Sequence, residues 1–364
     1  MALLFMDSFD HYVTADAGEK WSAFAATGAG TLPTVTIAAG AGRRGSGSFR
    51  YTTGSVSSQS GYANIAIPAS GPTCVVGVAF SPASLGTVAV NGAQIVSIRN
   101  GATVQITLRL NSDHTLSVVR GTHTGTALGS TVTALPVGTF TYLELQVLLH
   151  ASAGTVDLRI NGTSALSLTG QNTVNSGGAV WTSVGLMMQD TTTTSINASV
   201  TGRAFDFDDL YVLDGNGAAP WNTFLGDVRV DARLPTGAGA LAAWTPSAGA
   251  NWQNVDDAAP NDDTDYNSAA ASALTDTFVV QDAPVPGAAL YGVQVNLSAK
   301  KSDAGTCSLA SVVRQAGSNQ VAAAQNPGTS YAYLRTVYQT NPHTSAQWTE
   351  ADFNADEFGY QRTA

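Results

Sequence analysis

The chain has 364 residues, a length that suits two domains of common size. Only 12% of its residues are charged, and the formal net charge is −10. Affinity for nucleic acids depends on Lys and Arg that displace counterions, so DNA and RNA are not expected ligands.

Strand-like segments dominate the first two thirds of the chain. They are rich in β-branched and aromatic residues, recur about every ten residues, and are separated by Gly, Asn, Pro and Ser, a rhythm typical of antiparallel sandwiches or barrels. The NG pairs at Asn100-Gly101 and Asn161-Gly162 supply the positive φ that tight hairpins need. The eight predicted strands are TCVVGVAFSP, AQIVSIRN, VQITLRLN, HTLSVVRG, FTYLELQVLLH, GTVDLRING, TSVGLMMQ and FDFDDLYVLD.

A change of composition after FDFDDLYVLD predicts a domain boundary. The next segment, GNGAAPWNTFLGD, has Gly, Pro and polar residues in place of a strand pattern, so we expect domains at residues 1–217 and 218–364. Thr349 followed by Asp352 has the capping-box spacing that starts a short helix near the end. Five further strand-like segments predict a smaller C-terminal β-sandwich: GDVRVDARL, DTFVVQD, LYGVQVNLSAK, TCSLASVVRQ and TSYAYLRTVYQT.

Features of a secreted, disulfide-bonded or membrane-inserted protein are missing from the sequence. Cys74 and Cys307 are far apart in apolar or small-residue surroundings, which indicates buried free thiols. The start of the chain lacks the basic flank and apolar length of a signal peptide, and no apolar run is long enough to span a bilayer. We therefore expect no membrane insertion.

The segment FDFDDLYVLD has an unusual pattern of carboxylates. Its apolar residues change parity at Asp208-Asp209, which predicts a β-bulge or a change from a one-sided to a two-sided environment. Asp206, Asp208 and Asp209 could supply oxygen ligands for Ca²⁺. The alternative, which we favour because strand neighbours point to opposite faces, is two solvent-facing aspartates and one that bonds backbone amides.

A second acidic segment, VDDAAPNDDTDYNS, contains the D-x-D-x-N spacing that opens an EF-hand loop. The match ends there, because Ser268 and Leu274 replace the Gly and the bidentate Glu that the loop requires. A nonstandard Ca²⁺ site at Asp263, Asp265 and Asn267 stays open as an alternative to an acidic turn. We favour the turn and expect no metal.

No familiar catalytic constellation appears in the sequence. Sandwich glycosidases need two carboxyls, whereas Glu144 stands alone in TYLELQVLL and is expected on an exposed face. Nucleophile, metal-binding histidine, P-loop and dinucleotide patterns are also missing. We therefore predict no catalytic residue and no cofactor, and expect that the protein is not an enzyme.

Aromatic side chains give the one candidate for ligand binding. Most of the tryptophans are expected in cores, where large aromatic side chains are usually found. Trp244 and Trp252 differ because they lie in the small-residue segment AAWTPSAGANWQNVDD, where they could form a surface platform that stacks on sugar rings.

Several segments resemble a family of virus proteins. LLFMDSFDHY, VWTSVGLMMQ and FDFDDLYVLDG resemble the first and last strands of concanavalin A-like, laminin-G-like jelly rolls that are structural proteins of tailed bacteriophages. In such folds the first strand runs beside the last, which would place Asp7 and Asp10 near Asp206 to Asp209. The C-terminal third resembles the companion region of these proteins in WQNVDD, DDTDYN, DTFVVQD, YGVQVNLSAKKSDAG and NPHTSAQWTEADFNADEFGYQ.

The resemblance implies a non-enzymatic structural protein on the virion surface, as a fibre, head-decoration or tail subunit assembled in the host cytoplasm. Its implied partners are other capsid or tail proteins, and a homo-oligomer is expected, with a trimer favoured. The alternative function is a carbohydrate-binding host-adsorption protein whose lectin-like jelly roll recognises host surface glycans.

Overall fold

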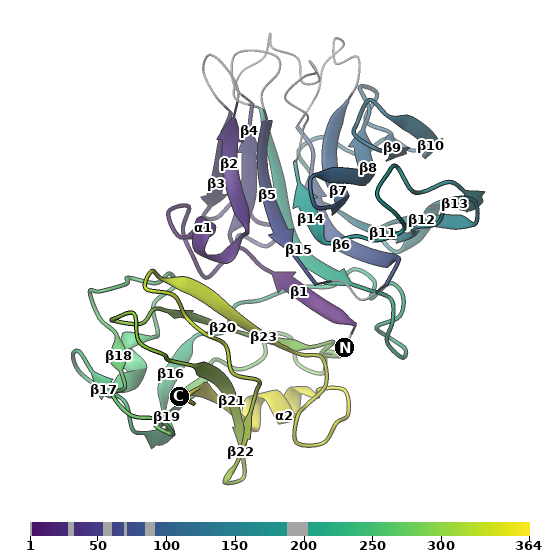
Figure 1. The fold of residues 1–364 in the computed structure, drawn as a ribbon. Coiled ribbons are helices and arrows are strands. Elements are labelled where there is room, and N and C mark those ends of the chain that lie inside the picture. Colours follow the sequence, from purple (N-terminus) through teal and green to yellow (C-terminus); the bar gives the residue numbers. More distant parts are fainter. Residues whose placement is uncertain (1, 28–32, 54–59, 69–70, 84–91, 188–202) are drawn as a thin grey trace. The chain divides into compact units, whose positions relative to one another are not determined.

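The computed structural model divides the chain into two compact units, unit 1 at Met1–Val230 and unit 2 at Asp231–Ala364 (Figure 1). It describes all residues except 1, 28–32, 54–59, 69–70, 84–91 and 188–202. Regular structure in the described residues is nearly all β, as predicted. The few helices found in this part of the chain are too short and too polar to cross a membrane.

Unit 1 is a sandwich of two antiparallel sheets, which we call sheets A and B (Figure 1). Among the described strands, sheet A has the order β13-β12-β11-β6-β15-β4-β3, with β1 paired to β15, and sheet B has the order β10-β9-β8-β7-β14-β5-β2. Sheet A consists of β1 (Leu3–Asp7), β3 (Thr34–Ala38), β4 (Ser48–Thr52), β6 (Thr73–Ser81), β11 (Thr141–Leu148), β12 (Gly154–Ile160), β13 (Thr163–Gln171) and β15 (Ala204–Leu213). Sheet B consists of β2 (Ala23–Thr27), β5 (Ser60–Ala66), β7 (Ala93–Asn100), β8 (Thr103–Leu110), β9 (Leu116–Arg120), β10 (Thr126–Ser130) and β14 (Ser183–Leu186).

All eight predicted strands are present, and the predicted hairpin turns are in place. The positive φ values of Gly101, Asn161 and Gly162 reverse the chain between β7 and β8 and between β12 and β13. Period-two alternation directs one side of each sheet inward, where apolar side chains fill the space between the layers. Aromatic rings of sheet A pack together in this core: Phe49, Phe80, Phe205 and Phe207.

The first strand runs beside the last strand of unit 1, as the jelly-roll resemblance implies. β1 pairs with β15 in antiparallel register, with Asp7 opposite Leu210 (Figure 1). Asp10 is close enough to Asp208 to act on it electrostatically, whereas the Asp7 carboxylate accepts the Phe9 N–H and the Tyr12 hydroxyl. It forms an ion pair with Lys20, on the short helix α1 (Ala17–Lys20), at 3.0 Å, and both side chains are fully buried.

The change of face predicted at Asp208-Asp209 is a β-bulge. Asp208 is opposite Ala79 on β6 and Tyr211 is opposite Gly77, so β15 contains one extra residue at this point. Asp209 has φ +50°, a left-handed conformation that Asp tolerates better than most residues. Before the bulge Phe205 and Phe207 point into the core, and after it Tyr211 points out.

Unit 2 is the smaller β unit that the sequence predicts. Its larger sheet, sheet C, has the order β16-β19-β24-β21-β22, and a second sheet pairs β20 with β23. The strands are β16 (Pro235–Ala242), β17 (Thr245–Pro246), β18 (Asn267–Ser268), β19 (Thr275–Val280), β20 (Val293–Ala299), β21 (Leu309–Gln315), β22 (Ser318–Val321), β23 (Ala332–Tyr338) and β24 (Glu357–Arg362), with a 3-10 helix at Asn251–Asn254.

The predicted late helix is α2 (Glu350–Ala355). Its capping box is formed as expected, because the Thr349 hydroxyl accepts the Asp352 N–H and the Asp352 carboxylate accepts the Thr349 N–H. Phe353 and Phe358 join Trp348 and Val313 in a core cluster, which fixes the helix to sheet C.

The composition changes after Gly217, where we predicted the domain boundary, but the two units divide later in the chain, between Val230 and Asp231. Residues 221–230, which we call the strap, form no strand, so the strand predicted at GDVRVDARL is wrong. The strap belongs to unit 1 because side chains of sheet A hold it. The contacts that do this form a polar region on the outer face of sheet A.

Candidate functional site

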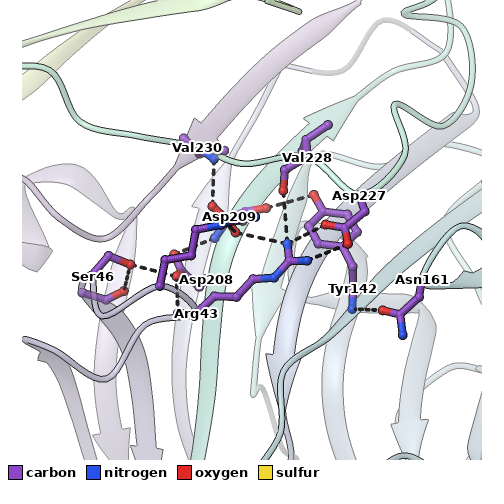
Figure 2. Close-up of polar contacts among 11 residues, drawn as sticks. Arg43, Ser46, Tyr142, Asn161, Asp208, Asp209, Asp227, Val228 and Val230 are labelled. Carbon is purple, nitrogen blue, oxygen red and sulfur yellow. Dashed lines mark hydrogen bonds and ion pairs between the residues drawn. The ribbon is translucent and has the colours of Figure 1, made fainter. Parts of the chain in front are cut away.

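The bulge on β15 is the centre of a charged network on the outer face of sheet A (Figure 2). The Asp209 carboxylate lies 2.8 Å from Arg44 Nη1 and 3.4 Å from Arg43 Nη1, and it accepts the Val230 N–H at 2.8 Å. Arg43 also pairs with Asp227 at 2.5 Å. Asp209 therefore joins the loop before β4 to the strap.

The other aspartates of β15 also have protein partners. Asp206 pairs with Arg50 at 2.7 Å and accepts the Ser48 hydroxyl. Asp208 accepts the Arg43 N–H and the Ser46 hydroxyl through one oxygen. The expectation that Asp206 and Asp208 are solvent-facing is wrong, because polar neighbours bury both. The favoured alternative to Ca²⁺ fits Asp209, whose carboxylate binds a backbone amide and two arginines.

Glu144 lies beneath the strap on the same outer face. Its Oε1 atom accepts the Tyr211 hydroxyl at 2.6 Å and the Gly226 N–H at 2.8 Å, and the side chain is fully buried. The prediction that Glu144 is exposed is therefore wrong. Tyr211 can lie across the sheet because Gly77 has no side chain, since a Cβ there would be 2.0 Å from the ring.

Further contacts fix the strap along sheet A. The Leu225 N–H donates to the Tyr211 hydroxyl, and the Thr223 hydroxyl donates to Gln146 on β11. The Arg159 guanidinium lies 4.4 Å from the centre of the Phe224 ring. The carboxylates of this face thus hold the chain's own segment, which covers the part of the sheet where a carboxylate pair could otherwise meet a substrate.

The second polar region lies on the outer face of sheet B. Strand register places four polar side chains in one row across β10, β9, β8 and β7, which we call the polar row: Ser130, Ser117, Arg109 and Gln94. On β5, Tyr62 and Asn64 alternate with buried Ala63 and Ile65 and so share this outer face. Asn64 is opposite Gly185 of β14, which links β5 to the rest of the sheet.

Two loops cover the middle of the outer face of β8. The Thr107 hydroxyl donates to the Gly121 carbonyl at 2.7 Å. Gln105 is bonded at both ends of its amide, because it accepts the Asn175 N–H and donates to the Ser176 carbonyl. Thr107 and Gln105 therefore have hydrogen-bond partners within the protein. The polar row crosses β8 at Arg109, beyond these two residues.

Arg109 is half-buried and has polar but uncharged partners. Its Nε donates to Asn111 Oδ1 at 3.0 Å, Nη1 to the His123 carbonyl at 2.7 Å and Nη2 to the Ser117 hydroxyl at 3.4 Å. Burial lowers the pKa of Arg109. No carboxylate in the described part of the chain forms an ion pair with it.

Two amide oxygens on the same face are buried without a hydrogen-bond partner. They are Gln94 Oε1, in the polar row, and Asn64 Oδ1, and neither finds a donor among the described residues. Gln94 is only 1% exposed. Buried acceptors of this kind cost stability, and a ligand that supplies donors removes the cost.

The aromatic candidates in unit 2 lie against a core cluster. Trp244 and Trp252 pack against the core cluster of Phe278, Leu309 and Tyr360. The Trp244 ring lies edge-on to Tyr360, and its Nε1 donates to the Leu274 carbonyl. Both tryptophans are only partly buried in this packing, so the sugar-stacking platform stays a prediction.

The acidic segment of unit 2 contains a turn, and two of its predicted ligands, Asp263 and Asn267, have separate partners. Asp263 pairs with Lys300 at 2.6 Å and accepts the Tyr331 hydroxyl, whereas Asn267 donates to Tyr360. Within the described ranges, no group of three or more His, Cys, Asp or Glu side chains has an arrangement that could hold a metal. Neither cysteine forms a disulfide; Cys74 is buried and Cys307 is partly exposed.

Comparisons of sequence and structure give matches at the level of fold. No family model matches the chain, and no curated protein matches its sequence. Among solved structures, an alginate lyase matches with 13% sequence identity and a TM-score of 0.36. The match covers 57% of this chain and 95% of the lyase chain. The exoplasmic/lumenal domain of VIP36, bound to Ca²⁺ and Man3GlcNAc, matches with 13% identity, 45% and 78% coverage and a TM-score of 0.29. A Trypanosoma rangeli sialidase matches with 9% identity, 45% and 25% coverage and a TM-score of 0.28.

These matches correct one expectation from the sequence. The absence of a familiar motif led us to expect that the protein is not an enzyme, whereas the matching structures include alginate lyases and sialidases. Motif searches detect residues at a known spacing along one chain segment. A site built from side chains of separate strands, such as the polar row, has no such spacing.

Replacing Asp209 by Asn should loosen the strap. Asn keeps the size and tolerates the left-handed backbone, but it removes the negative charge beside Arg43 and Arg44, so we expect a loss of about 1–3 kcal/mol in the free energy of unfolding. Hydrogen exchange of the Val230 amide should accelerate, whereas Asp157→Asn, at a carboxylate bonded to the Ser167 hydroxyl, should leave it unchanged. A melting temperature that EDTA lowers and Ca²⁺ restores would instead show that a metal binds here.

The stability of unit 1 should depend on the ionisation of Asp208. Burial, followed by the neighbouring Asp209 carboxylate, raises the pKa of Asp208 from 3.8 to about 7. The folded protein therefore binds this proton more tightly than the unfolded chain does. The resulting gain in stability is complete at pH values below the pKa of Asp208 in the unfolded chain, and it is lost as the pH rises through about 7. Thermal melts between about pH 5 and pH 8 should show a steeper decrease for wild type than for Asp208→Asn. Equal slopes would contradict this assignment.

Proposed function

We propose that unit 1 binds carbohydrate on the outer face of sheet B. The observation that carries the proposal is the pair of buried, unpartnered amide oxygens on this face, Gln94 Oε1 and Asn64 Oδ1, among the described residues. Sugar hydroxyls are donors as well as acceptors, so they match a surface of amide, hydroxyl and guanidinium groups.

The arrangement of polar groups supports this face over the outer face of sheet A. On sheet A, the carboxylates of Glu144 and Asp209 already hold the strap. On sheet B, the polar row crosses four neighbouring strands. Side chains on rigid strands are held in position more precisely than side chains on loops. Tyr62, on the same face, has the flat ring on which a sugar could stack.

Binding should therefore depend on side chains that stability does not need. Asn64→Ala removes an unpartnered buried oxygen, so we expect an unchanged or slightly raised melting temperature together with weaker glycan binding. A glycan array identifies bound sugars, and titration of a positive glycan should show a decrease in affinity of about fivefold or more, as expected for the loss of one hydrogen bond.

Gln146→Ala, on the covered face of sheet A, is the matched control and should leave affinity unchanged. The same samples should be assayed for cleavage of the glycan, so that binding and turnover are separated. A blank array, or Asn64→Ala binding as tightly as wild type, would reject the proposal.

We also propose that the protein is a component of a bacteriophage particle, with other virion proteins as partners and a trimer as its assembly. The support is the sequence resemblance of LLFMDSFDHY, FDFDDLYVLDG and the C-terminal third to virion proteins. Mass spectrometry of purified particles should detect the chain at a constant ratio to the capsid protein. Its absence from purified particles would reject this role, whether or not unit 1 binds glycans.

A further inference from the structure

The guanidinium of Arg109 lies in a setting unlike that of several other arginines of this chain. Five arginines each form an ion pair with a carboxylate: Arg43, Arg44, Arg50, Arg233 and Arg314. The chain has more acidic than basic residues, 26 Asp and Glu against 16 Lys and Arg, so acidic partners are abundant. Yet no carboxylate of the described residues pairs with Arg109, although burial disfavours its charge.

Arg109 also has donors to spare. A guanidinium has five N–H groups. Its hydrogen bonds within the described residues use one on Nε, one on Nη1 and one on Nη2, which leaves one N–H on each terminal nitrogen. Two N–H groups of one guanidinium are what an oxyanion such as a carboxylate accepts in a bidentate pair.

Gln94 is the neighbour of Arg109 across β7 and β8, and it supplies a second contact point. Directly opposed residues of an antiparallel pair have Cβ atoms about 5 Å apart. Two side chains at this spacing can contact an acid group and a hydroxyl group of the same pyranose ring. The acid group would pair with Arg109, and the hydroxyl would donate to Gln94 Oε1, which has no donor within the described residues.

We infer that the glycan bound on sheet B is acidic, with its carboxylate or sulfate group held by Arg109 and a neighbouring hydroxyl held by Gln94. This inference rests on the proposed carbohydrate-binding function and names the class of sugar that the site selects. Ser117, Asn111 and the His123 carbonyl hold the guanidinium in position, so little side-chain freedom is lost when the acid binds.

Paired polymers that differ in charge alone test the inference on the full chain. The first pair is a polyuronate and its carboxyl-reduced, neutral form, and the second is dextran sulfate and dextran. We expect the wild-type protein to bind at least one acidic polymer about tenfold or more tightly than its neutral counterpart, the effect of one charge-assisted pair. The pair that shows the preference identifies the acid group as carboxylate or sulfate.

Variants at Arg109 then assign the preference to this residue. Arg109→Gln should lower affinity for the acidic polymer to that for the neutral one, and Arg109→Lys should retain part of the preference because it keeps the charge without the planar fork. Lys301→Gln, which removes one positive charge from unit 2, is the matched control and should change neither affinity.

A measurement on the wild-type protein covers the case in which an Arg109 variant does not fold. The free acidic monosaccharide, glucuronate or a sulfated glucose, should displace the acidic polymer, whereas glucose should not. Equal binding of acidic and neutral polymers, or equal displacement by glucose, would overturn the inference while leaving carbohydrate binding intact. Failure of every polymer and every array glycan to bind would instead reject the proposed function itself.

Discussion

The bulge at Asp209 is the constraint on which much of unit 1 depends. Strict alternation along β15 would have kept Phe205, Phe207 and Tyr211 on one face, and the tyrosine hydroxyl would then have pointed into an apolar core. The extra residue turns Tyr211 outward, and the left-handed backbone of Asp209 directs its carboxylate to Arg43, Arg44 and the Val230 amide. One local irregularity therefore determines both the core and the attachment of the strap.

Attachment of the strap divides the roles of the two sheets. Glu144 and Tyr211 bind Gly226 and Leu225 of the strap, so these side chains of sheet A are used in a contact within the chain. On the outer face of sheet B, an arginine lacks a carboxylate and two amide oxygens lack donors among the described residues. In a folded protein, buried polar groups usually have partners, so groups left without them indicate where a ligand can contribute.

The fold was largely predictable from the sequence, whereas the site was not. Eight strands follow from alternation and turn residues, but β2, β3, β4, β5, β10 and β13 of unit 1 were missed. Four of these six have only five residues, and Ala, Thr, Ser and Gly weaken the strand pattern in most of them. The parity change in FDFDDLYVLD predicts either a bulge or a change of environment, and the structure contains the bulge. Its partners Arg43 and Arg44 could not be predicted, since sheet topology brings them together. Arg109 lies in a predicted strand, and parity alone predicts that its side chain is on the other face of the sheet from Leu108 and Leu110. Its lack of an acidic partner could not be predicted, because it depends on residues of four strands and two loops.

Net charge is a poor guide to what the polar row can bind. A chain with a net charge of −10 repels polyanions at long range, which is why nucleic acids were set aside. That repulsion is screened within about 10 Å at ordinary salt, whereas a bidentate pair with a half-buried guanidinium acts at contact and is screened less. Several of the described carboxylates, moreover, are paired with internal cations such as Arg43, Arg50 and Lys20. A single acidic sugar therefore meets the local field of Arg109 rather than the average field of the protein, while an extended duplex would meet the average.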